Sequence, residues 1–157
     1  MMRKSVLFLL ICLCVILAVG CAPKEKETAD EASEQTVFAI ALDDLNNEPA
    51  FFDWVQENTP MQVIAMVDGE GQPRLAYNTC QSCGGSPYAY FEYLGDHILQ
   101  CQNCGLIFLD DTVGTPRAAG CNPYTISDFD VSDGMITVAA EELSKAVPLF
   151  ANWKVFE

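Results

Sequence analysis

The chain has 157 residues, half of them hydrophobic, and a formal net charge of −14. Only 8 lysines and arginines stand against 22 aspartates and glutamates, so the protein repels polyanions and we expect no nucleic-acid partner. The length allows one core of ordinary size and leaves little room for a second domain.

The N-terminus has the pattern of an export signal. Arg3 and Lys4 precede an apolar run from Val6 to Val19, and Gly20 stands directly before Cys21. A basic start, a short apolar core and a small residue before the cut are typical of a secretory signal. The run is shorter than the roughly 20 residues of a membrane-spanning helix, which leaves an uncleaved anchor as the alternative.

This segment resembles a bacterial lipoprotein signal, in which Cys21 becomes the lipidated first residue of the mature chain. Residues 1–20 are then the signal peptide, 21–35 form a charged, disordered tether, and 36–157 form the domain. We therefore expect a protein anchored by lipid at the extracytoplasmic face of the cell membrane. An ordinary signal with an incidental cysteine is the alternative.

The first half of the domain is rich in β-forming residues. Residues 36–42 predict a first strand, and Pro49–Trp54, which contains three aromatic residues, predicts a short strand or turn that contributes to the core. An aromatic ligand platform is the alternative there. Residues 61–67 and 74–77 flank a glycine-containing turn, so they predict a hairpin that ends three residues before Cys80.

The second half continues with hairpins. Residues 88–93 and 97–100 predict a hairpin that leads into Cys101, and 106–109 predict a further short strand. Residues 124–131 and 135–138 flank an Asp-Gly turn and predict a third hairpin.

The C-terminal part predicts a short helix at 141–147, which ends before Pro148. The apolar residues after it predict a strap that docks on the sheet: Leu149, Phe150, Trp153 and Phe156. Altogether the sequence predicts a mainly β, small α+β domain.

Two CxxCG motifs dominate the chemistry of the domain. Cys80 and Cys83 form CQSCG, Cys101 and Cys104 form CQNCG, and 17 residues separate the motifs. This spacing is typical of a rubredoxin-like or zinc-ribbon-like double knuckle, in which two hairpin tips bring four thiolates around one metal ion.

Three further residues belong to this cluster. Gly84 and Gly105 follow the pairs, and we expect them to let the backbone turn tightly so that its amides point at the sulfurs. Cys121, in GCNP, is a fifth cysteine. Cys121 could be a metal ligand, a reactive or cross-linking thiol, or a buried structural residue.

The cysteines themselves leave the cofactor open. They could bind one zinc or iron ion, hold a small iron–sulfur cluster or form disulfides, and spacing does not distinguish zinc from iron. His97, the only histidine, is more typical of a packing residue than of a ligand.

The motifs in order resemble one family. NTCQSCGG at 78–85, CQNCG at 101–105 followed by Phe108, and GCNP at 120–123 are similar to the FtrD-like membrane iron–sulfur protein family. The resemblance implies metal thiolates at Cys80, Cys83, Cys101 and Cys104, with Cys121 as a candidate fifth. It also implies an iron–sulfur electron carrier of bacterial iron uptake, with a membrane redox or iron-uptake protein as partner.

The chain departs from that family in its membrane attachment. Family members linked to iron uptake carry several membrane helices, whereas this chain offers only its signal, which favours a tethered lipoprotein. The signal has no twin arginine, so we expect export of the unfolded chain, after which a single ion can be captured during folding. The expected cofactor is thus an iron–sulfur cluster by resemblance or one iron ion on physical grounds, with zinc as the alternative.

The predicted function is electron transfer in extracytoplasmic iron handling, and we expect no enzymatic activity. The sequence shows no phosphate loop and no serine–histidine–aspartate set. The alternatives are a structural zinc-ribbon-like interaction module and a thiol–disulfide or metal-sensing protein in which Cys121 exchanges with a knuckle.

Overall fold

The computed structural model describes residues 37–116 and 120–156. The predicted signal peptide, the tether, the lipidation site Cys21 and Thr36 of the expected first strand lie outside the described residues. No helix within the described ranges is both long and apolar enough to cross a bilayer.

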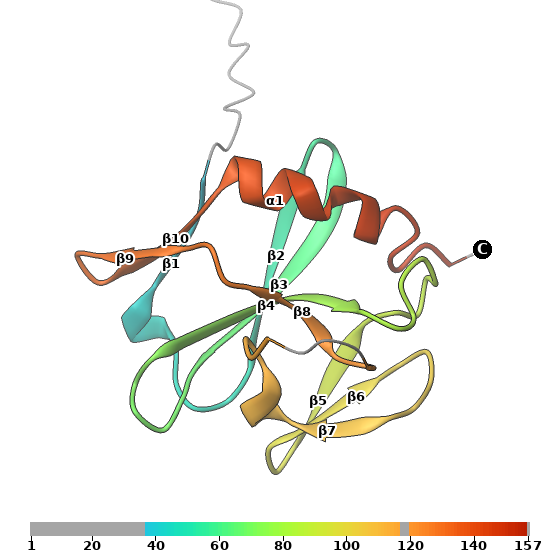
Figure 1. Cartoon of the computed structure of the whole chain (residues 1–157), viewed down its shortest axis with the longest axis horizontal. Helices are drawn as coiled ribbons and strands as arrows, with labels where there is room; N and C mark the ends of the chain where they lie inside the picture. The colour runs from blue at the N-terminus through green and yellow to red at the C-terminus, as the bar shows by residue number, and fades with distance from the viewer. Residues whose placement is uncertain (1–36, 117–119, 157) are drawn as a thin grey trace, which may run out of the picture. The chain divides into compact units, whose positions relative to one another are not determined.

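Three antiparallel sheets build the fold (Figure 1). The first sheet contains, in spatial order, β1 (Val37–Ala41), β10 (Met135–Ala139) and β9 (Asp130–Ser132). The second contains β2 (Ala50–Gln56), β3 (Thr59–Val67), β4 (Pro73–Cys80) and β8 (Pro123–Ile126). The third contains β5 (Phe91–Gly95), β6 (Ile98–Cys101) and β7 (Ile107–Leu109). The expectation of a mainly β domain is confirmed.

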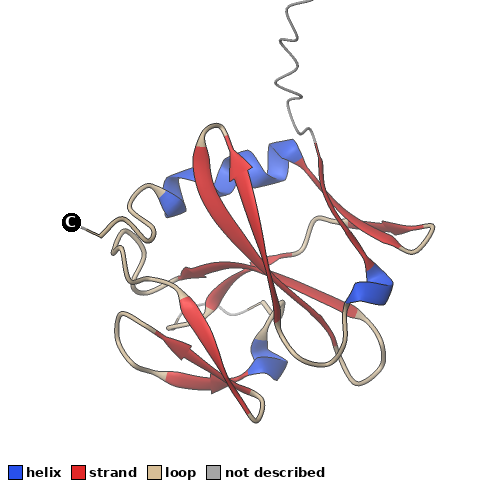
Figure 2. Cartoon of the chain, turned by 180° about the vertical axis from the view of Figure 1, so that it is seen from behind, coloured by secondary structure: helices blue, strands red, loops and turns tan. Residues whose placement is uncertain are grey.

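Four helical segments accompany these sheets in the described part of the chain. They are the α-helix α1 (Ala140–Ala146) and the short 3₁₀ helices η1 (Leu42–Asp44), η2 (Asp110–Thr112) and η3 (Val147–Phe150). Seen from behind, α1 lies beside β2 and β3, at the end of the molecule away from the third sheet (Figure 2). The predicted helix at 141–147 is confirmed with its bounds shifted by one residue.

The central strands β3 and β4 divide the interior into two cores. Alternate side chains of a strand point to opposite faces, so Leu75 and Tyr77 of β4 enter one cluster while Ala76 and Cys80 enter the other. The first core lies between the first two sheets, and the second core lies between the second and third sheets. Because both faces of β3 and β4 are covered, polar and apolar residues do not alternate along them, and Val63–Val67 of β3 is an unbroken apolar run.

The C-terminal segment closes the first core. Leu143 of α1 is fully buried there, and the buried rings of Phe150 and Trp153 pack edge to face with centroids 5.3 Å apart. The predicted strap is therefore confirmed for these two aromatic residues. It is wrong for Phe156, which is 54% exposed, because the chain has by then left the sheet for the Tyr88 loop.

Two predicted strand limits are wrong for a common reason. Strand β4 continues to Cys80, and residues 124–126 form β8 on β4 instead of extending the third hairpin. That hairpin consists only of β9 and β10. In both cases the register of β4 with β8, which pairs Leu75 with Ile126 and Cys80 with Pro123, decides the outcome. This pairing joins residues about 45 positions apart, which local sequence patterns do not reveal.

Candidate metal centre

Strand ends deliver the five cysteines of the domain to one place. Cys80 ends β4 and Cys101 ends β6, while Cys83 and Cys104 lie in the turns that follow these strands. Cys121 stands two residues before β8 begins. The expectation that both CxxC pairs sit at strand ends is confirmed.

Backbone pairing brings these strand ends together. Cys80 pairs with Pro123 of β8, which carries Cys121 alongside, and Cys101 pairs with Phe91 of β5. The N–H of Cys80 also donates to the carbonyl of Ala89, at 3.0 Å. The segment that enters β5 is thereby bound to both knuckles, so their positions are fixed relative to each other.

The sulfur atoms converge. The Sγ atoms of Cys80, Cys83, Cys101 and Cys121 all lie within 4.8 Å of one another. Cys80 and Cys121 are 3.1 Å apart, and Cys83 and Cys101 are 3.9 Å apart. Cys104 is 2.9 Å from Cys121. All five cysteines are free, and each of these distances exceeds the ~2.05 Å of a disulfide bond.

The cluster has a closed side and an open side. Cys80 and Cys101 are buried in the second core, and Cys83 and Cys121 are partly buried. Cys104 is exposed. Solvent and large molecules can therefore approach the sulfurs from the side of Cys104.

Burial and hydrogen bonding set the protonation of the thiols. Burial raises the pKa of Cys101 to about 12, although the N–H groups of Cys104 and Asn103 act in the opposite direction. Burial also raises the pKa of Cys121. A hydrogen bond from Cys121, supported by the N–H of Leu106, lowers the pKa of Cys104 to about 7. Cys101 and Cys121 therefore hold their protons at neutral pH, and a metal ion must displace these protons on binding.

The glycines of the two knuckles differ. Gly105 has a φ of +73°, in the left-handed region that favours glycine, so its predicted turn is confirmed. Gly84 also lies in the predicted turn, but the left-handed residue of the first knuckle is Gly85, at +87°. A side chain at Gly84 would instead meet the carbonyl of Cys80, since its Cβ would lie 3.4 Å from that oxygen.

The sulfur spacing fits a single metal ion. Thiolates at about 2.3 Å from a tetrahedral ion stand roughly 3.8 Å apart, and the observed separations scatter around this value. A multi-iron cluster separates its cysteines further, because several irons then lie between them. Among the described residues, no other group of three or more cysteine, histidine or carboxylate side chains converges in this way.

Asn78 is a site residue that sequence reasoning missed. It is fully buried two positions before Cys80, and its side chain spans β4 and β5. Its Oδ1 accepts the N–H of Phe91 at 2.7 Å, and its Nδ2 donates to the carbonyl of Phe91 at 3.2 Å and to Oε1 of Gln62 at 2.7 Å. Asn78 thus fixes the second sheet to the third beside the metal centre. A polar residue inside a hydrophobic strand was the available signal.

His97 lies apart from the sulfurs. Its Nδ1 is 3.0 Å from Oδ2 of the buried Asp110, and its side chain is 57% exposed. It does not belong to the group of converging ligands. The expectation that it is not a metal ligand agrees with this arrangement.

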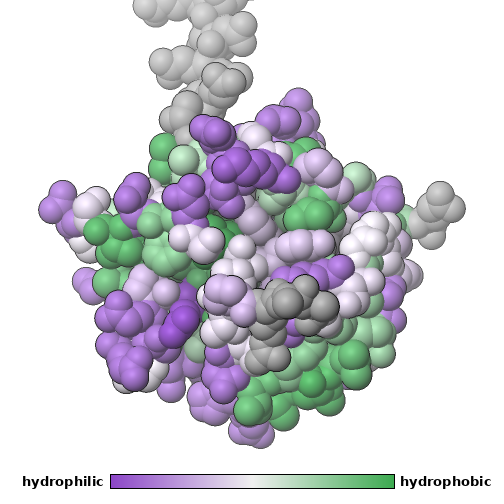
Figure 3. Space-filling view, viewed as in Figure 1, coloured by the Kyte–Doolittle hydropathy of each residue, from purple (hydrophilic) through white to green (hydrophobic). Residues whose placement is uncertain are grey.

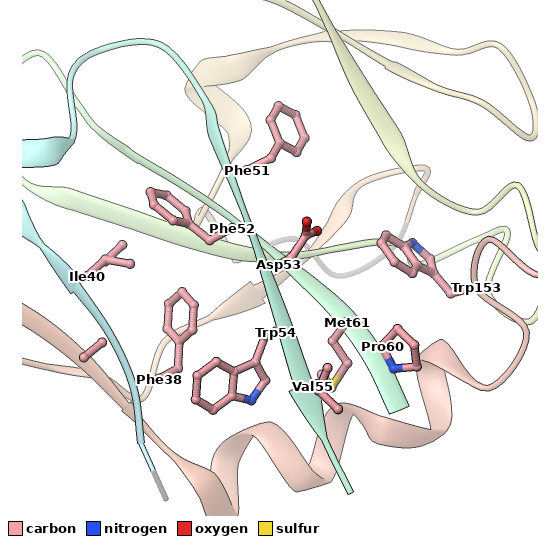
Figure 4. A pocket seen from close by; sticks show the side chains of 11 residues that line it. Phe38, Ile40, Phe51, Phe52, Asp53, Trp54, Val55, Pro60, Met61 and Trp153 are labelled. Atoms are coloured by element: carbon pink, nitrogen blue, oxygen red, sulfur yellow. The ribbon is translucent and has the colours of Figure 1, made fainter. Parts of the chain in front are cut away.

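A concave surface along β2 is apolar. The cavity has a volume of about 590 Å³, and Figure 4 shows the aromatic side chains around it. Phe38 packs edge to face on Phe52 and Trp54, with ring centroids 6.3 and 5.4 Å away. Both partners also pack against the first core, which supports the prediction that Pro49–Trp54 contributes to the core.

Comparison with known proteins agrees with the cysteine pattern. No curated protein and no solved structure matches the chain. A family model described as "Membrane iron-sulfur containing protein FtrD-like" matches residues 45–150, which include every cysteine of the converging cluster. The match covers more than half of the chain, and the protein therefore belongs to the FtrD-like family.

Proposed function

We propose that this protein is an electron carrier with a cysteine-bound iron centre, held at the extracytoplasmic face of the cell membrane by a lipid on Cys21. The observation that carries the proposal is the convergence of five free thiols at one partly open site. The family description names a membrane protein that contains iron and sulfur, which supports the iron and an association with a membrane.

Three cysteines serve as constant ligands, and two share the fourth position. The sulfurs of Cys80, Cys83 and Cys101 belong to the group that lies within 4.8 Å of one another. Cys104 and Cys121 lie 2.9 Å apart, so either sulfur reaches the same coordination position. A tetrahedral ion takes only one of them at a time, and the other stays beside it as a hydrogen-bonding neighbour.

Iron is favoured over zinc by the proposed role, since iron in a thiolate site supplies one-electron chemistry and zinc does not. The spacing of the sulfurs supports a single ion, and a small iron–sulfur cluster is the second form that the family description supports. The protein contributes the N–H groups that point at Cys101 and Cys104, because these hydrogen bonds stabilise negative charge on sulfur and so tune the potential.

Metal analysis of protein purified without oxygen tests the proposal. We expect iron together with thiolate-to-iron absorption, and we expect the substitution Cys80→Ser to abolish both. Cys104→Ser and Cys121→Ser should each retain the metal, whereas the double variant should lose it.

Three other results would change the assignment of the ligands or of the metal. A spectrum left intact by Cys80→Ser would remove this residue from the ligand set. Loss of metal in only one of the two single variants would identify that cysteine as the constant fourth ligand. Colourless protein with one zinc per chain would support a structural zinc module instead.

A thiol–disulfide or metal-sensing function is the second candidate, and the contact between Cys104 and Cys121 favours it. The two sulfurs are close, and the lowered pKa of Cys104 makes this thiol the more nucleophilic partner at neutral pH. Thiol counting before and after reduction distinguishes the two functions. Five free thiols in the metal-free domain would argue against a resting disulfide.

A further inference from the structure

The outer face of the third sheet carries large aliphatic side chains although it faces solvent. The strand register places Ile98 beside Leu109 and Gln100 beside Ile107, so these side chains share one face. Leu99, between them in sequence, points the other way and is fully buried in the second core. An ordinary half-buried sheet carries mainly polar residues on its outer face, whereas here Glu92 and Gln100 share the face with large aliphatic side chains.

Four large aliphatic side chains make up this surface, which we call the apolar face. Leu94 is 54% exposed, and Leu106, Ile107 and Leu109 are each 56% exposed. The space-filling view shows hydrophobic residues gathered over β5, β6 and β7 at the lower right (Figure 3). Together they expose roughly 400 Å², the size at which a surface patch on a monomer is often functional.

The apolar face is continuous with the open side of the metal centre. Leu106 follows the exposed Cys104 by two residues, and its carbonyl accepts the N–H of Cys101 at 3.0 Å. The backbone therefore links this face to the sulfurs directly. Cys104 and Leu106 are both exposed and only two residues apart, so a molecule that covers Leu106 lies near Cys104.

Charge restricts what can cover this face. The chain carries a net charge of −14, yet residues 98–109, which include β6 and β7, contain no charged side chain, and the charged Glu92 of β5 stands opposite Gln100 at the edge of this face. A second copy of the chain and an anionic leaflet both carry charge of the same sign as this protein and are repelled by it. An uncharged apolar surface on a different protein avoids this repulsion.

The size of the apolar face and its position in the domain also favour a transient protein partner. Stable dimers bury about 800 Å² per partner, whereas transient redox encounters bury less, in the range that the apolar face provides. Figure 1 shows β1, where the described chain begins, at the opposite end of the domain from the third sheet. A domain tethered to the membrane through its N-terminus can therefore present the apolar face away from the bilayer.

We propose that the apolar face is the docking surface for a redox protein that presents an uncharged apolar face of its own, beside Cys104. The inference rests on the proposed function. With iron bound by the cysteines, one electron would pass between that iron and the redox group of the docked partner, so that one is oxidised as the other is reduced. Contacts through a few aliphatic side chains bring the two proteins close together but let the complex dissociate quickly, which suits repeated electron transfer.

Adsorption to a methyl-terminated alkanethiol layer on gold, with voltammetry on the same layer, tests the proposal, because this layer imitates an uncharged apolar partner. We expect the double substitution Ile107→Glu and Leu109→Glu to lower both the adsorption constant and the electron-transfer rate by about tenfold or more. The double serine variant, which removes apolar area without adding charge, should also lower the adsorption constant and the electron-transfer rate.

The matched control is Val131→Glu with Met135→Glu, since these residues of the first sheet are 47% and 37% exposed. The control should behave as the unmodified chain.

Three outcomes would overturn the proposal. One is an equal loss of adsorption in the control variant. Another is binding of the unmodified chain to phosphatidylcholine vesicles that the Ile107 and Leu109 substitutions abolish, which would assign the face to a membrane. The last is a dimer in sedimentation that the same substitutions dissociate. Absence of current from every variant, with adsorption still dependent on Ile107 and Leu109, would instead count against the electron-carrier function and leave the docking surface supported.

Discussion

At the scale of single residues, the five cysteines are chemically unequal although their sequence motifs are alike. Cys101 and Cys104 belong to one CxxC pair, yet burial raises the pKa of the first to about 12 and hydrogen bonding lowers that of the second to about 7. The difference arises because Cys101 ends a strand inside the second core, whereas Cys104 lies on the exposed turn. The pair therefore presents one protected and one reactive sulfur.

This inequality predicts the reactivity of the metal-free protein. Alkylation by iodoacetamide should show one fast thiol, Cys104, whose rate rises with pH and reaches half of its maximum near pH 7, because the thiolate is the reacting form. Mass spectrometry of the modified peptides identifies the site. The Cys104→Ser variant is the control and should lack the fast phase. A midpoint near pH 9, the ordinary value for a cysteine, would show that the contact with Cys121 does not persist without metal.

At the scale of elements, β4 organises the molecule. It pairs with β3 and β8, faces both cores with alternate side chains and ends at Cys80. Its connection to the third sheet depends on Asn78, whose side chain completes the backbone hydrogen bonding of Phe91. The indole N–H of Trp153 also donates to the carbonyl of Asn78, at 2.7 Å, so the C-terminal strap is fixed at the same point.

Removal of the Asn78 side chain should therefore weaken the junction between sheets. We expect Asn78→Ala to lower the free energy of unfolding by roughly 2–4 kcal/mol, because the N–H and carbonyl of Phe91 lose their buried partners. Chemical denaturation followed by tryptophan fluorescence measures the change. Thr79→Val is the matched control, since Thr79 is equally buried and its hydroxyl has no hydrogen-bond partner. An equal loss in both variants would indicate general sensitivity of β4 to substitution.

At the scale of the whole molecule, the two cores depend differently on the metal centre. The first core consists of apolar side chains from the first two sheets, α1 and the strap, and it contains no cysteine among its described members. The second core includes Cys80 and Cys101, with Cys83 and Cys121 packed against it. A bound ion therefore adds cross-links only to the core that holds the third sheet in place.

Metal removal should thus loosen one part of the protein selectively. After chelation, hydrogen exchange should accelerate at the amides of Cys101 and Gln102, which donate to the carbonyls of Leu106 and Tyr90. The exchange rates of the amides that pair β1 with β10 should change little. Metal at about 100 times its dissociation constant stabilises the folded state by about 2.7 kcal/mol, so protection in the third sheet should return on adding metal. Equal loss of protection in both cores would mean that they unfold as one cooperative unit.

The sequence by itself determined the local elements and the chemistry of the site. Glycine-containing turns with flanking β-forming residues specify the hairpins β3–β4 and β5–β6, and the CxxCG spacing specifies a thiol cluster, because these signals depend on neighbours in the chain. The family assignment also follows from these motifs. These local signals do not predict which segments distant in the chain pair with each other.

Only the tertiary structure decided how the sulfurs meet and what surrounds them. Pairing of β8 with β4 carries Cys121 to within 3.1 Å of Cys80, although 41 positions separate them in the chain. The same folding buries Asn78 and leaves Leu109 exposed, an inversion of what polarity alone would predict. The physical reason is that burial and contact depend on which faces of distant strands come together, and the register between sheets settles this.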